Sequence, residues 1–218
     1  ALARGGADLI KDDHSLADQP WAPFADRTRR CAEAVAEANA RTGGRTLYLP
    51  HLTGPLDRAR ERAEAALELG CRGALVNALP AGLPTLRALA GDGRLFLLAH
   101  PSLTGGLFGA DHGIAPAVLL GTLFRIAGAD GVIYPNVGGR FPFDEETCRA
   151  VNDRLRGPLG VVRSSFPVPG GGIDVERIPR WTEAYGQDTV FLVGGSLYAQ
   201  PDLEDATRRL VDELEGHG

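Results

Sequence analysis

Methionine is absent from this 218-residue sequence, and lysine occurs only once, at Lys11. Without an initiator, and with an opening "ALARGGADLI" that reads as the tail of a helix, the chain is expected to be the later part of a longer polypeptide. Arginine supplies every other basic side chain except histidine. Lysine differs from arginine because its amine can lose a proton and become a nucleophile or a carbamate. Lys11 is therefore a candidate reactive residue, and an ordinary salt bridge is the alternative.

Cysteine is scarce as well. Cys31, Cys71 and Cys148 are odd in number and far apart, which excludes a CxxC zinc motif and a disulfide framework. Free thiols in a reducing cytoplasm explain them. No apolar run is long enough to span a membrane, no signal peptide is visible, and a net charge of −5 argues against a nucleic-acid surface. We therefore expect a cytoplasmic protein that binds neither membrane nor nucleic acid.

Apolar runs and amphipathic stretches alternate along the whole chain, which has 44% hydrophobic and 23% charged residues. The runs are apolar on both faces, as in a buried parallel sheet, and the alternation predicts βαβ units. The predicted strands are "ADLI", "RTLYL", "GALVNAL", "RLFLLAH", "DGVIYP", "LGVVRSSFPV" and "TVFLVGG". The predicted helices are 25–41, 55–69, 83–90, 114–127, 144–156, 174–185 and 202–215.

Two architectures agree with seven strand–helix units. One is an open doubly wound sheet, and the other is a (β/α)8 barrel that lacks one strand. Barrels typically need about 250 residues, so 218 residues correspond to a barrel with one unit lost. We expect a single α/β domain over 1–218.

Polar residues follow nearly every predicted strand. In parallel α/β folds these carboxyl ends form the ligand crevice. Any one such residue is weak evidence, because turns also favour Asp, Asn, Ser and Gly, but their collective placement is stronger evidence. The residues concerned are Lys11, Asp12, Asp13, His14, His51, Thr53, Asn77, His100, Pro101, Ser102, Tyr134, Asn136, Gly194, Gly195, Ser196 and the "PGGG" turn at 169–172.

Three of these groups suggest specific chemistry. "KDDH" at 11–14 offers oxygen ligands for a hard cation such as Mg²⁺. His100 is a candidate acid–base group or orienting group, although a histidine at a strand end is more often structural. The glycines of "GGGI" and "VGGS" leave backbone amides bare for a phosphate, with tight turns as the alternative.

The glycine-rich 103–113 segment is a candidate lid or a long turn, and His112 and His217 are expected at the surface.

The motifs together resemble the ribulose bisphosphate carboxylase (RuBisCO) large-chain family. "GGADLIKDD" is similar to the motif around that family's carbamylated lysine, and "FPVPGGGIDVERIPRWTEAYGQDTVFLVGGSLYAQP" is similar to its C-terminal block. "NALPAG" also resembles the middle of that barrel. The resemblance runs in order through essentially the whole chain. It implies the C-terminal barrel of a RuBisCO-like (form IV) protein, without the family's N-terminal α/β domain and first barrel strand.

Carried over residue by residue, the resemblance assigns roles within a Mg²⁺ site. Lys11 matches the lysine whose CO₂-derived carbamate binds Mg²⁺. Asp13 matches a carboxylate ligand of the ion, and His14 stands at the position of the third ligand. His100 matches an active-site histidine. Gly171, Gly172, Gly194 and Gly195 match the backbone that binds the substrate's phosphate.

Several positions depart from the family pattern. His14 stands where the family has a glutamate, and Pro101 where it has an arginine. Ile133 takes the place of a histidine, Arg140 that of the loop-six lysine, and Gly170 that of a serine. Because of these changes, carboxylation of ribulose bisphosphate is not expected. They also weaken the second phosphate clamp, so a substrate with one phosphate is favoured.

The resemblance leaves three functions open. "KDDH" with "HPSLTGG" resembles the branch of 3-oxo-isoapionate 4-phosphate decarboxylases and transcarboxylases, so the leading expectation is a Mg²⁺-dependent decarboxylase that acts through an enediolate on a phosphorylated sugar acid. A keto-sugar-phosphate isomerase or enolase of the 5-methylthioribulose 1-phosphate type is the alternative and needs a base. A non-catalytic sugar-phosphate-binding relic is the third. The family also implies a homodimer whose active site is completed by the partner's N-terminal domain.

Overall fold

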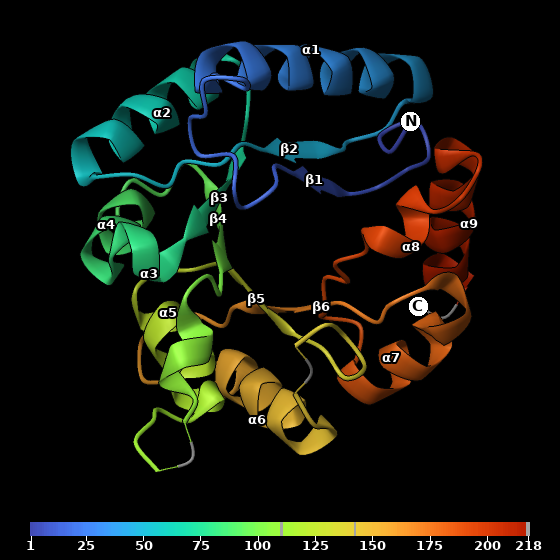
Figure 1. Cartoon of the computed structure of the whole chain (residues 1–218). Coiled ribbons are helices and arrows are strands. Elements are labelled where there is room, and N and C mark those ends of the chain that lie inside the picture. Colours follow the sequence, from blue (N-terminus) through green and yellow to red (C-terminus); the bar gives the residue numbers. More distant parts are fainter. Residues whose placement is uncertain (110, 142, 217–218) are drawn as a thin grey trace.

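A ring of parallel strands surrounded by helices forms the centre of the molecule (Figure 1). The computed structural model describes residues 1–109, 111–141 and 143–216. The strands are β1 (Leu9–Lys11), β2 (Leu47–Leu49), β3 (Gly73–Asn77), β4 (Phe96–His100), β5 (Gly131–Pro135) and β6 (Phe166–Gly170). The first two pair in parallel, and the other four form a parallel sheet in the order β3-β4-β5-β6.

Backbone hydrogen bonds extend this arrangement at both ends of the larger sheet. Beyond β2, the Leu52 amide donates to the Leu75 carbonyl at 2.9 Å, which links β2 to β3. Beyond β6, the amides of Val190 and Leu192 donate to the carbonyls of Pro167 and Pro169 at 3.0 and 3.1 Å. The predicted seventh strand, "TVFLVGG", is thus a short stretch paired with β6 through a single bridge rather than a full strand.

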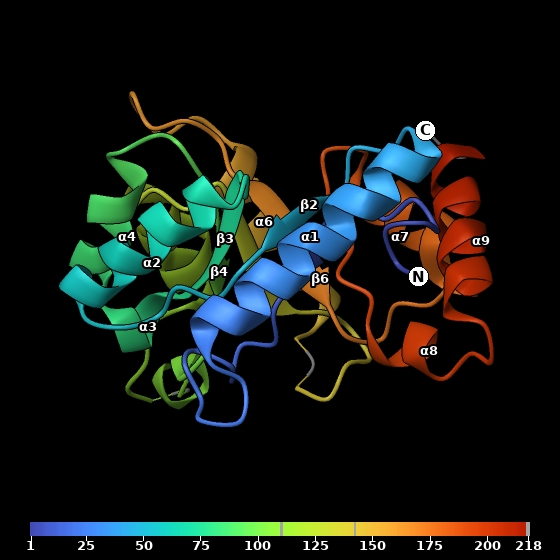
Figure 2. The same ribbon diagram turned by 90° about the horizontal axis from the view of Figure 1, so that it is seen from above.

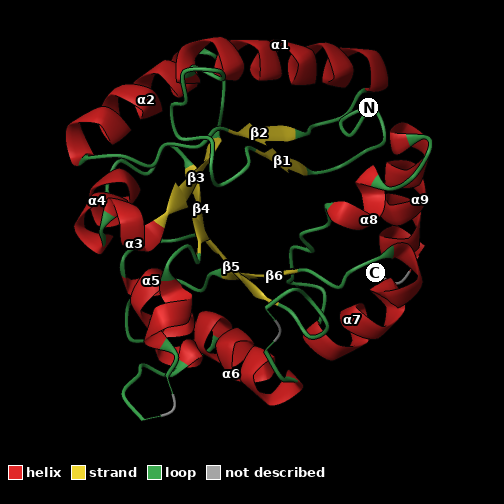
Figure 3. Cartoon of the chain, in the orientation of Figure 1, coloured by secondary structure: helices red, strands yellow, loops and turns green. Residues whose placement is uncertain are grey.

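The helices lie outside the ring in the front view (Figure 3). The α-helices are α1 (Phe24–Thr42), α2 (Leu56–Glu68), α3 (Ala78–Ala81), α4 (Leu83–Ala90), α5 (Phe124–Ile126), α6 (Glu145–Arg156), α7 (Ile178–Tyr185), α8 (Gly195–Tyr198) and α9 (Leu203–Gly216). The view from above shows α1 lying across β2 (Figure 2). Two short 3₁₀ turns, η1 (Thr104–Leu107) and η3 (Val175–Arg177), and a π-helical segment, η2 (Ala117–Leu123), complete the set.

Local sequence explains the helix ends. Asp144 caps α6 by accepting a hydrogen bond from the Thr147 amide at 2.7 Å, and Glu145 and Glu146 follow in the first turn, where the helix dipole favours acids. At the other end of a helix, Gly43 adopts the left-handed conformation, with φ of 72°, that ends α1. The short helices α3 and α8 were not predicted, because four residues are too few to show a helical period.

The side chains of the strands decide between the two candidate architectures. Along β4, Leu97 and Ala99 pack with the helices, whereas Phe96 and Leu98 point to the other face of the sheet. There they join a separate inner cluster, whose described members come from the strands and from the 190–192 stretch and include Leu49, Leu75, Ile133 and Val168. An open doubly wound sheet would have helices on both faces. An inner layer built from strand side chains is the interior of a barrel.

The ring has one open side. In the ranges that the structure describes, no backbone pairing joins β1 to the 190–192 segment. An apolar cavity of about 600 Å³ lies between them, lined among others by Leu9, Leu98, Val168 and Leu192. That one barrel strand is missing from this chain stays a prediction. No helix among the described residues is long and apolar enough to cross a membrane.

Candidate active site at the carboxyl ends of the strands

The structure brings Lys11, Asn77 and His100 to one end of the ring, because each is the last residue of its strand. Asn77 and His100 are direct neighbours in the parallel pairing of β3 with β4. The side-chain amide of Asn77 donates to the His14 carbonyl at 2.9 Å, which fixes the loop after β1 against β3. Three strands thus contribute to one polar cluster.

His14 and His100 lie face to face. Their ring centroids are 4.1 Å apart and their planes differ by 9°. His100 is held from behind, since its Nδ1 lies 2.8 Å from the Ser102 hydroxyl. Burial, together with the charges of His14 and Lys11, lowers the pKa of His100 to about 3. His100 is therefore a neutral hydrogen-bonding ring near pH 7, whereas the His14 side chain is 47% exposed and open to a ligand.

Lys11 is half-buried, and its Nζ donates to the Asp12 carbonyl at 3.1 Å. Burial lowers the pKa of Lys11, and the carboxylates of Asp13 and Asp12 offset part of that shift. A lowered pKa increases the fraction of neutral amine, which is the form that reacts with CO₂.

The two adjacent aspartates, Asp12 and Asp13, differ in burial and in hydrogen bonding. Asp12 is buried and accepts hydrogen bonds from Arg27 Nε at 2.9 Å, the Tyr48 hydroxyl at 2.6 Å and the His51 amide at 3.0 Å. With its oxygens committed to these donors, Asp12 ties β1 to α1 and β2. It is a structural residue rather than a ligand.

Asp13 instead faces solvent, with its side chain 58% exposed. Its Oδ1 accepts from the Ser15 amide at 2.9 Å and the Ser15 hydroxyl at 2.6 Å, and its Oδ2 lies 3.8 Å from His14 Nδ1. Partial burial raises the pKa of Asp13, but the hydrogen bonds from Ser15 and the charges of His14 and Lys11 outweigh this effect and lower it. Asp13 is thus an ionised carboxylate beside Lys11 and His14.

A second polar chain borders the cluster; its residues were expected at the strand ends but were not assigned a catalytic, phosphate-binding or metal-binding role. His51 Nε2 lies 2.5 Å from the Thr53 hydroxyl oxygen. The same oxygen accepts a hydrogen bond from the backbone amide of Asn77 at 2.7 Å. Two buried atoms beside it, His51 Nδ1 and Asn77 Oδ1, have no hydrogen-bond partner among the described residues. The signal in the sequence was their position after predicted strands, which by itself did not separate them from turn residues.

The two glycine turns lie next to each other. The Ser196 hydroxyl donates to the Ile173 carbonyl at 2.9 Å, and Leu192 pairs with Gly170. A Cβ added at Gly194 or Gly195 would meet nothing within 4 Å, so these two positions border open space. This arrangement leaves room for a ligand beside the second turn.

The first turn also needs its glycines for packing. Gly171 and Gly172 have φ of 92° and 67°, a region that side chains disfavour. A Cβ at Gly172 would lie 2.8 Å from the Val137 carbonyl oxygen. The tight-turn interpretation is therefore sufficient for Gly172, whereas it does not account for Gly195.

The positions that depart from the family pattern lie around the same end. Ile133 is buried in the inner cluster with Val168, where an aliphatic side chain packs well. Arg140 is exposed, with its guanidinium 5.2 Å from the Phe141 ring centroid. Pro101 follows His100 directly, and its carbonyl accepts from the amide and hydroxyl of Thr104 in η1. Neither Ile133 nor Pro101 can supply the hydrogen bonds of the histidine and arginine that they replace.

Of the 103–113 segment, Thr104–Leu107 forms η1 and Leu103 has a positive φ of 67°. Ala110, in the middle of this candidate lid, lies outside the described residues. The lid stays a prediction. His112 is exposed, as expected, and His217 lies outside the described residues.

Unmodified side chains do not complete a metal centre here. Among the described residues, no group of three His, Cys, Asp or Glu side chains lies close enough to hold a metal ion. Asp13 and His14 supply only two such groups. A metal centre at this place would need a third ligand, and Lys11 as a carbamate would add two oxygens, the ligands that Mg²⁺ prefers.

Fold and cluster together define an α/β barrel protein whose polar groups gather at the carboxyl ends of its strands, the end where barrel enzymes hold their active sites. Comparison with known families agrees with this class and narrows it. Residues 1–208 match the catalytic domain of the ribulose bisphosphate carboxylase large chain. The chain belongs to the RuBisCO large-chain family, on its RuBisCO-like side.

Known relatives resemble nearly the whole chain. A 5-methylthioribulose-1-phosphate isomerase of Rhodospirillum rubrum is 42% identical over 99% of this chain and 57% of its own length. A 2,3-diketo-5-methylthiopentyl-1-phosphate enolase of Geobacillus kaustophilus is 35% identical over 92% of this chain and 49% of its own length. A Rubisco-like protein from Rhodopseudomonas palustris superposes with a TM-score of 0.91 and 38% identity, and covers 100% of this chain and 58% of that one. The chain thus spans about half to three-fifths of the length of these relatives.

Proposed function

We propose that the protein containing this chain is an enzyme that isomerises a keto-sugar phosphate through an enediolate. The observation that carries the proposal is the 42% identity, over 99% of the chain, to a 5-methylthioribulose-1-phosphate isomerase. The enolases among the relatives share less identity, 35% in the example above. No relative reported above is named a decarboxylase. The comparisons therefore favour the isomerase or enolase alternative over the decarboxylation that the sequence suggested.

Within this proposal, the polar cluster supplies the proton transfers. An isomerase needs a base that removes a proton next to a carbonyl and returns it elsewhere, and such a base works best with a pKa near the working pH. A group with a pKa of about 3 is a weak base, so His100 serves as a hydrogen-bond partner for a substrate oxygen. His14, exposed and stacked on His100, is the proposed proton carrier.

Mg²⁺ suits the donor set of this cluster when Lys11 carries a carbamate. The carbamate and Asp13 would then hold the ion, while His14 stays off it as the proton carrier. The lowered pKa of Lys11 supports formation of the carbamate from the neutral amine. The buried Asn77 Oδ1, which has no partner among the described residues, is an additional oxygen beside them. Bound there, Mg²⁺ supplies Lewis-acid stabilisation of a substrate oxyanion.

The glycine turns are the proposed site for the substrate's phosphate. Gly194 and Gly195 contribute backbone next to open space, and Gly171 and Gly172 form the facing turn. Barrels frequently bind phosphate after their seventh and eighth strands, which are the positions that β6 and the 190–192 stretch occupy if one strand precedes β1. A homodimer whose N-terminal domains complete the site remains part of this proposal, as does a cytoplasmic location.

The test uses the full-length protein with Mg²⁺ and bicarbonate. It is incubated separately with 5-methylthioribulose 1-phosphate, with 2,3-diketo-5-methylthiopentyl 1-phosphate and with a 3-oxo acid phosphate. Phosphorus and proton NMR in D₂O follow isomerisation, enolisation and deuterium uptake, and trapped CO₂ measures decarboxylation. We expect isomerised product and deuterium uptake from the first substrate. Product from 2,3-diketo-5-methylthiopentyl 1-phosphate alone would indicate an enolase. Release of CO₂ from the 3-oxo acid phosphate would support a decarboxylase, and binding without turnover would indicate a non-catalytic sugar-phosphate-binding protein.

Lys11→Ala and Lys11→Arg are the diagnostic variants. Neither can form the carbamate, so we expect turnover to fall by roughly 10²- to 10⁴-fold, the range of a lost catalytic group, while the melting temperature stays close to that of the wild type. Arg30→Ala, which changes an exposed side chain on α1, serves as the matched control and should retain turnover. Full turnover in Lys11→Arg would refute the role of the carbamate.

A further inference from the structure

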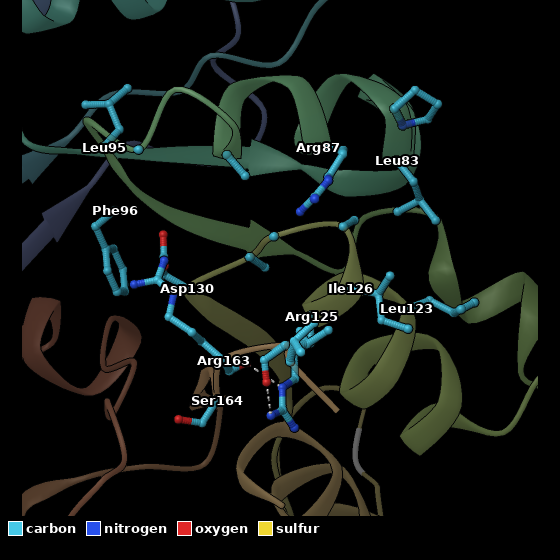
Figure 4. Close-up of a pocket in the computed structure, with 18 of the residues that line it drawn as sticks. Leu83, Arg87, Leu95, Phe96, Leu123, Arg125, Ile126, Asp130, Arg163 and Ser164 are labelled. Atoms are coloured by element: carbon cyan, nitrogen blue, oxygen red, sulfur yellow. Dashed lines mark hydrogen bonds and ion pairs between the residues drawn. The ribbon is translucent and has the colours of Figure 1, made fainter. Parts of the chain in front are cut away.

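A second cavity lies at the opposite end of the barrel from the polar cluster. Its volume is about 850 Å³, within the range of small-molecule sites. Residues from α4, α5, the start of β4, the segment before β5 and the 161–164 segment line it (Figure 4). Phe96 is the first residue of β4 and Asp130 directly precedes β5, whereas His100 and Pro135 end the same strands. The cavity is thus separated from the candidate active site by the length of the strands.

Positive charge dominates the lining. Arg87, Arg94, Arg125 and Arg163 contribute four guanidinium groups, and Asp130 is the single acidic residue among the described lining residues. Arg94 is already neutralised, because it pairs with both Glu64 and Asp92. The other three arginines therefore determine the potential in the cavity.

Arg125 carries a buried charge without a carboxylate partner. It is 3% exposed, and its guanidinium donates to four backbone carbonyls, those of Arg154, Gly157, Val162 and Arg163, at 2.7 to 3.0 Å. No ion pair involving Arg125 occurs in the described part of the chain. Burial lowers the pKa of Arg125, the direction expected for a cation with no nearby anion. An anion in the cavity would stabilise this charge.

Arg87 and Arg163 are free to contact such an anion. Figure 4 shows Arg87 reaching from α4 into the cavity, with Arg125 and Arg163 on the opposite wall. The Arg87 side chain forms no hydrogen bond or ion pair with any described residue, and it is exposed. Arg163 is 91% exposed and lies 3.6 Å from Asp130 Oδ1. The other oxygen of Asp130 already accepts from the Leu97 amide at 2.9 Å, so Asp130 neutralises at most one arginine.

Apart from Ser164, the other side chains of the wall are apolar. Leu83, Leu95, Leu123 and Ile126 line it, with Val161, which is fully exposed to solvent, at its rim. An inorganic anion alone would leave these side chains in water. A ligand with both an anionic group and an apolar or flat body would contact arginines and aliphatic wall together.

We propose that this cavity binds a small organic anion, a phosphate or carboxylate attached to an apolar or flat body. Arg87 and Arg163 hold the anionic group from opposite sides, and Arg125 contributes its charge from beneath the wall. The aliphatic residues cover the body of the ligand. This site is independent of the proposed catalysis at the other end of the barrel.

Calorimetric titration of the full-length protein with two probes tests the proposal. Adenosine 5′-diphosphate carries an anionic group and a flat body, and inorganic pyrophosphate carries the anionic group alone. We expect saturable binding of ADP that is at least tenfold tighter than that of pyrophosphate and that weakens as the salt concentration rises. Arg87→Glu should weaken ADP binding at least tenfold, and Arg87→Lys should restore part of it.

Two controls locate the probe. Arg30→Glu makes the same charge change on the exposed face of α1 and should leave ADP binding within twofold of the wild type. Lys11→Ala alters the candidate active site and should also leave it unchanged. Absence of saturable ADP binding would overturn the proposal. So would ADP binding that survives Arg87→Glu or that is lost in Lys11→Ala, because the probe would then bind elsewhere.

Discussion

Asp12→Ala offers a sharp test of how the site is supported, because it separates the two neighbouring aspartates. The Asp12 carboxylate is 4% exposed and pairs with Arg27, whose side chain is 9% exposed. The same carboxylate also accepts from the Tyr48 hydroxyl and the His51 amide. Removing it leaves a buried guanidinium without its counter-charge and two further donors without an acceptor.

The magnitude follows from that geometry. Breaking a buried ion pair by removing one partner costs about 3–5 kcal/mol, because the remaining charge stays desolvated. For a domain of this size each kcal/mol shifts the melting temperature by about 2–4 °C, so we expect Asp12→Ala to melt roughly 6–20 °C below the wild type. Asp12→Asn keeps the shape of the side chain, but the three groups around it all donate hydrogen bonds to Asp12. The NH₂ group of the asparagine would therefore face at least one of these donors, and we expect the free energy of unfolding to fall by about 1–3 kcal/mol.

Thermal unfolding followed by circular dichroism measures the effect, with Asp13→Ala and Asp212→Ala as comparisons. Asp13 is 58% exposed, so its removal should shift the melting temperature by only a few degrees while it abolishes Mg²⁺-dependent turnover. Asp212, exposed on α9, should change the free energy of unfolding by no more than about 0.5 kcal/mol. If Asp12→Ala had the same melting temperature as the wild type, the buried hydrogen bonds and ion pair of Asp12 would not stabilise the fold as described here.

The remaining predictions concern pH and the glycine turns. Burial lowers the pKa of His51 to about 4, below its ordinary value of 6.5, so the unfolded chain binds more protons than the folded one between these values. The melting temperature should therefore fall as pH drops from about 6.5 to 4, and this fall should be shallower in His51→Gln; an identical pH profile in the variant would refute it. Gly172→Ala should lower the melting temperature, because its Cβ would lie 2.8 Å from the Val137 carbonyl oxygen at a positive φ. Gly195→Val should keep the melting temperature but raise KM for the phosphorylated substrate, and an unchanged KM would remove Gly195 from the phosphate site.

Local patterns in the sequence determined much of the secondary structure. The predicted helix 83–90 is α4, and the predicted helix 144–156 differs from α6 by one residue at its start. These elements depend on side-chain periodicity and on capping residues such as Asp144, which are properties of neighbouring positions. The same local reasoning placed Lys11 and His100 at strand ends, because a polar residue after an apolar run marks where a buried strand stops. The resemblance of the motifs then identified the family correctly.

Tertiary structure decided what depends on residues far apart in the chain. Barrel and open sheet have the same alternation of strands and helices, and only the inner cluster of Leu75, Leu98 and Val168 distinguishes them. Adjacent Asp12 and Asp13 look equivalent in "KDDH", yet Arg27 and the residues after β2 reach one of them and leave the other to solvent. Likewise, the arginines that line the second cavity are spread over more than seventy residues of sequence, and the fold brings α4 and the segments before β5 and β6 to one cavity. Sequence spacing reports which side chains are neighbours within one element, whereas the charge and burial of a site depend on which elements pack together.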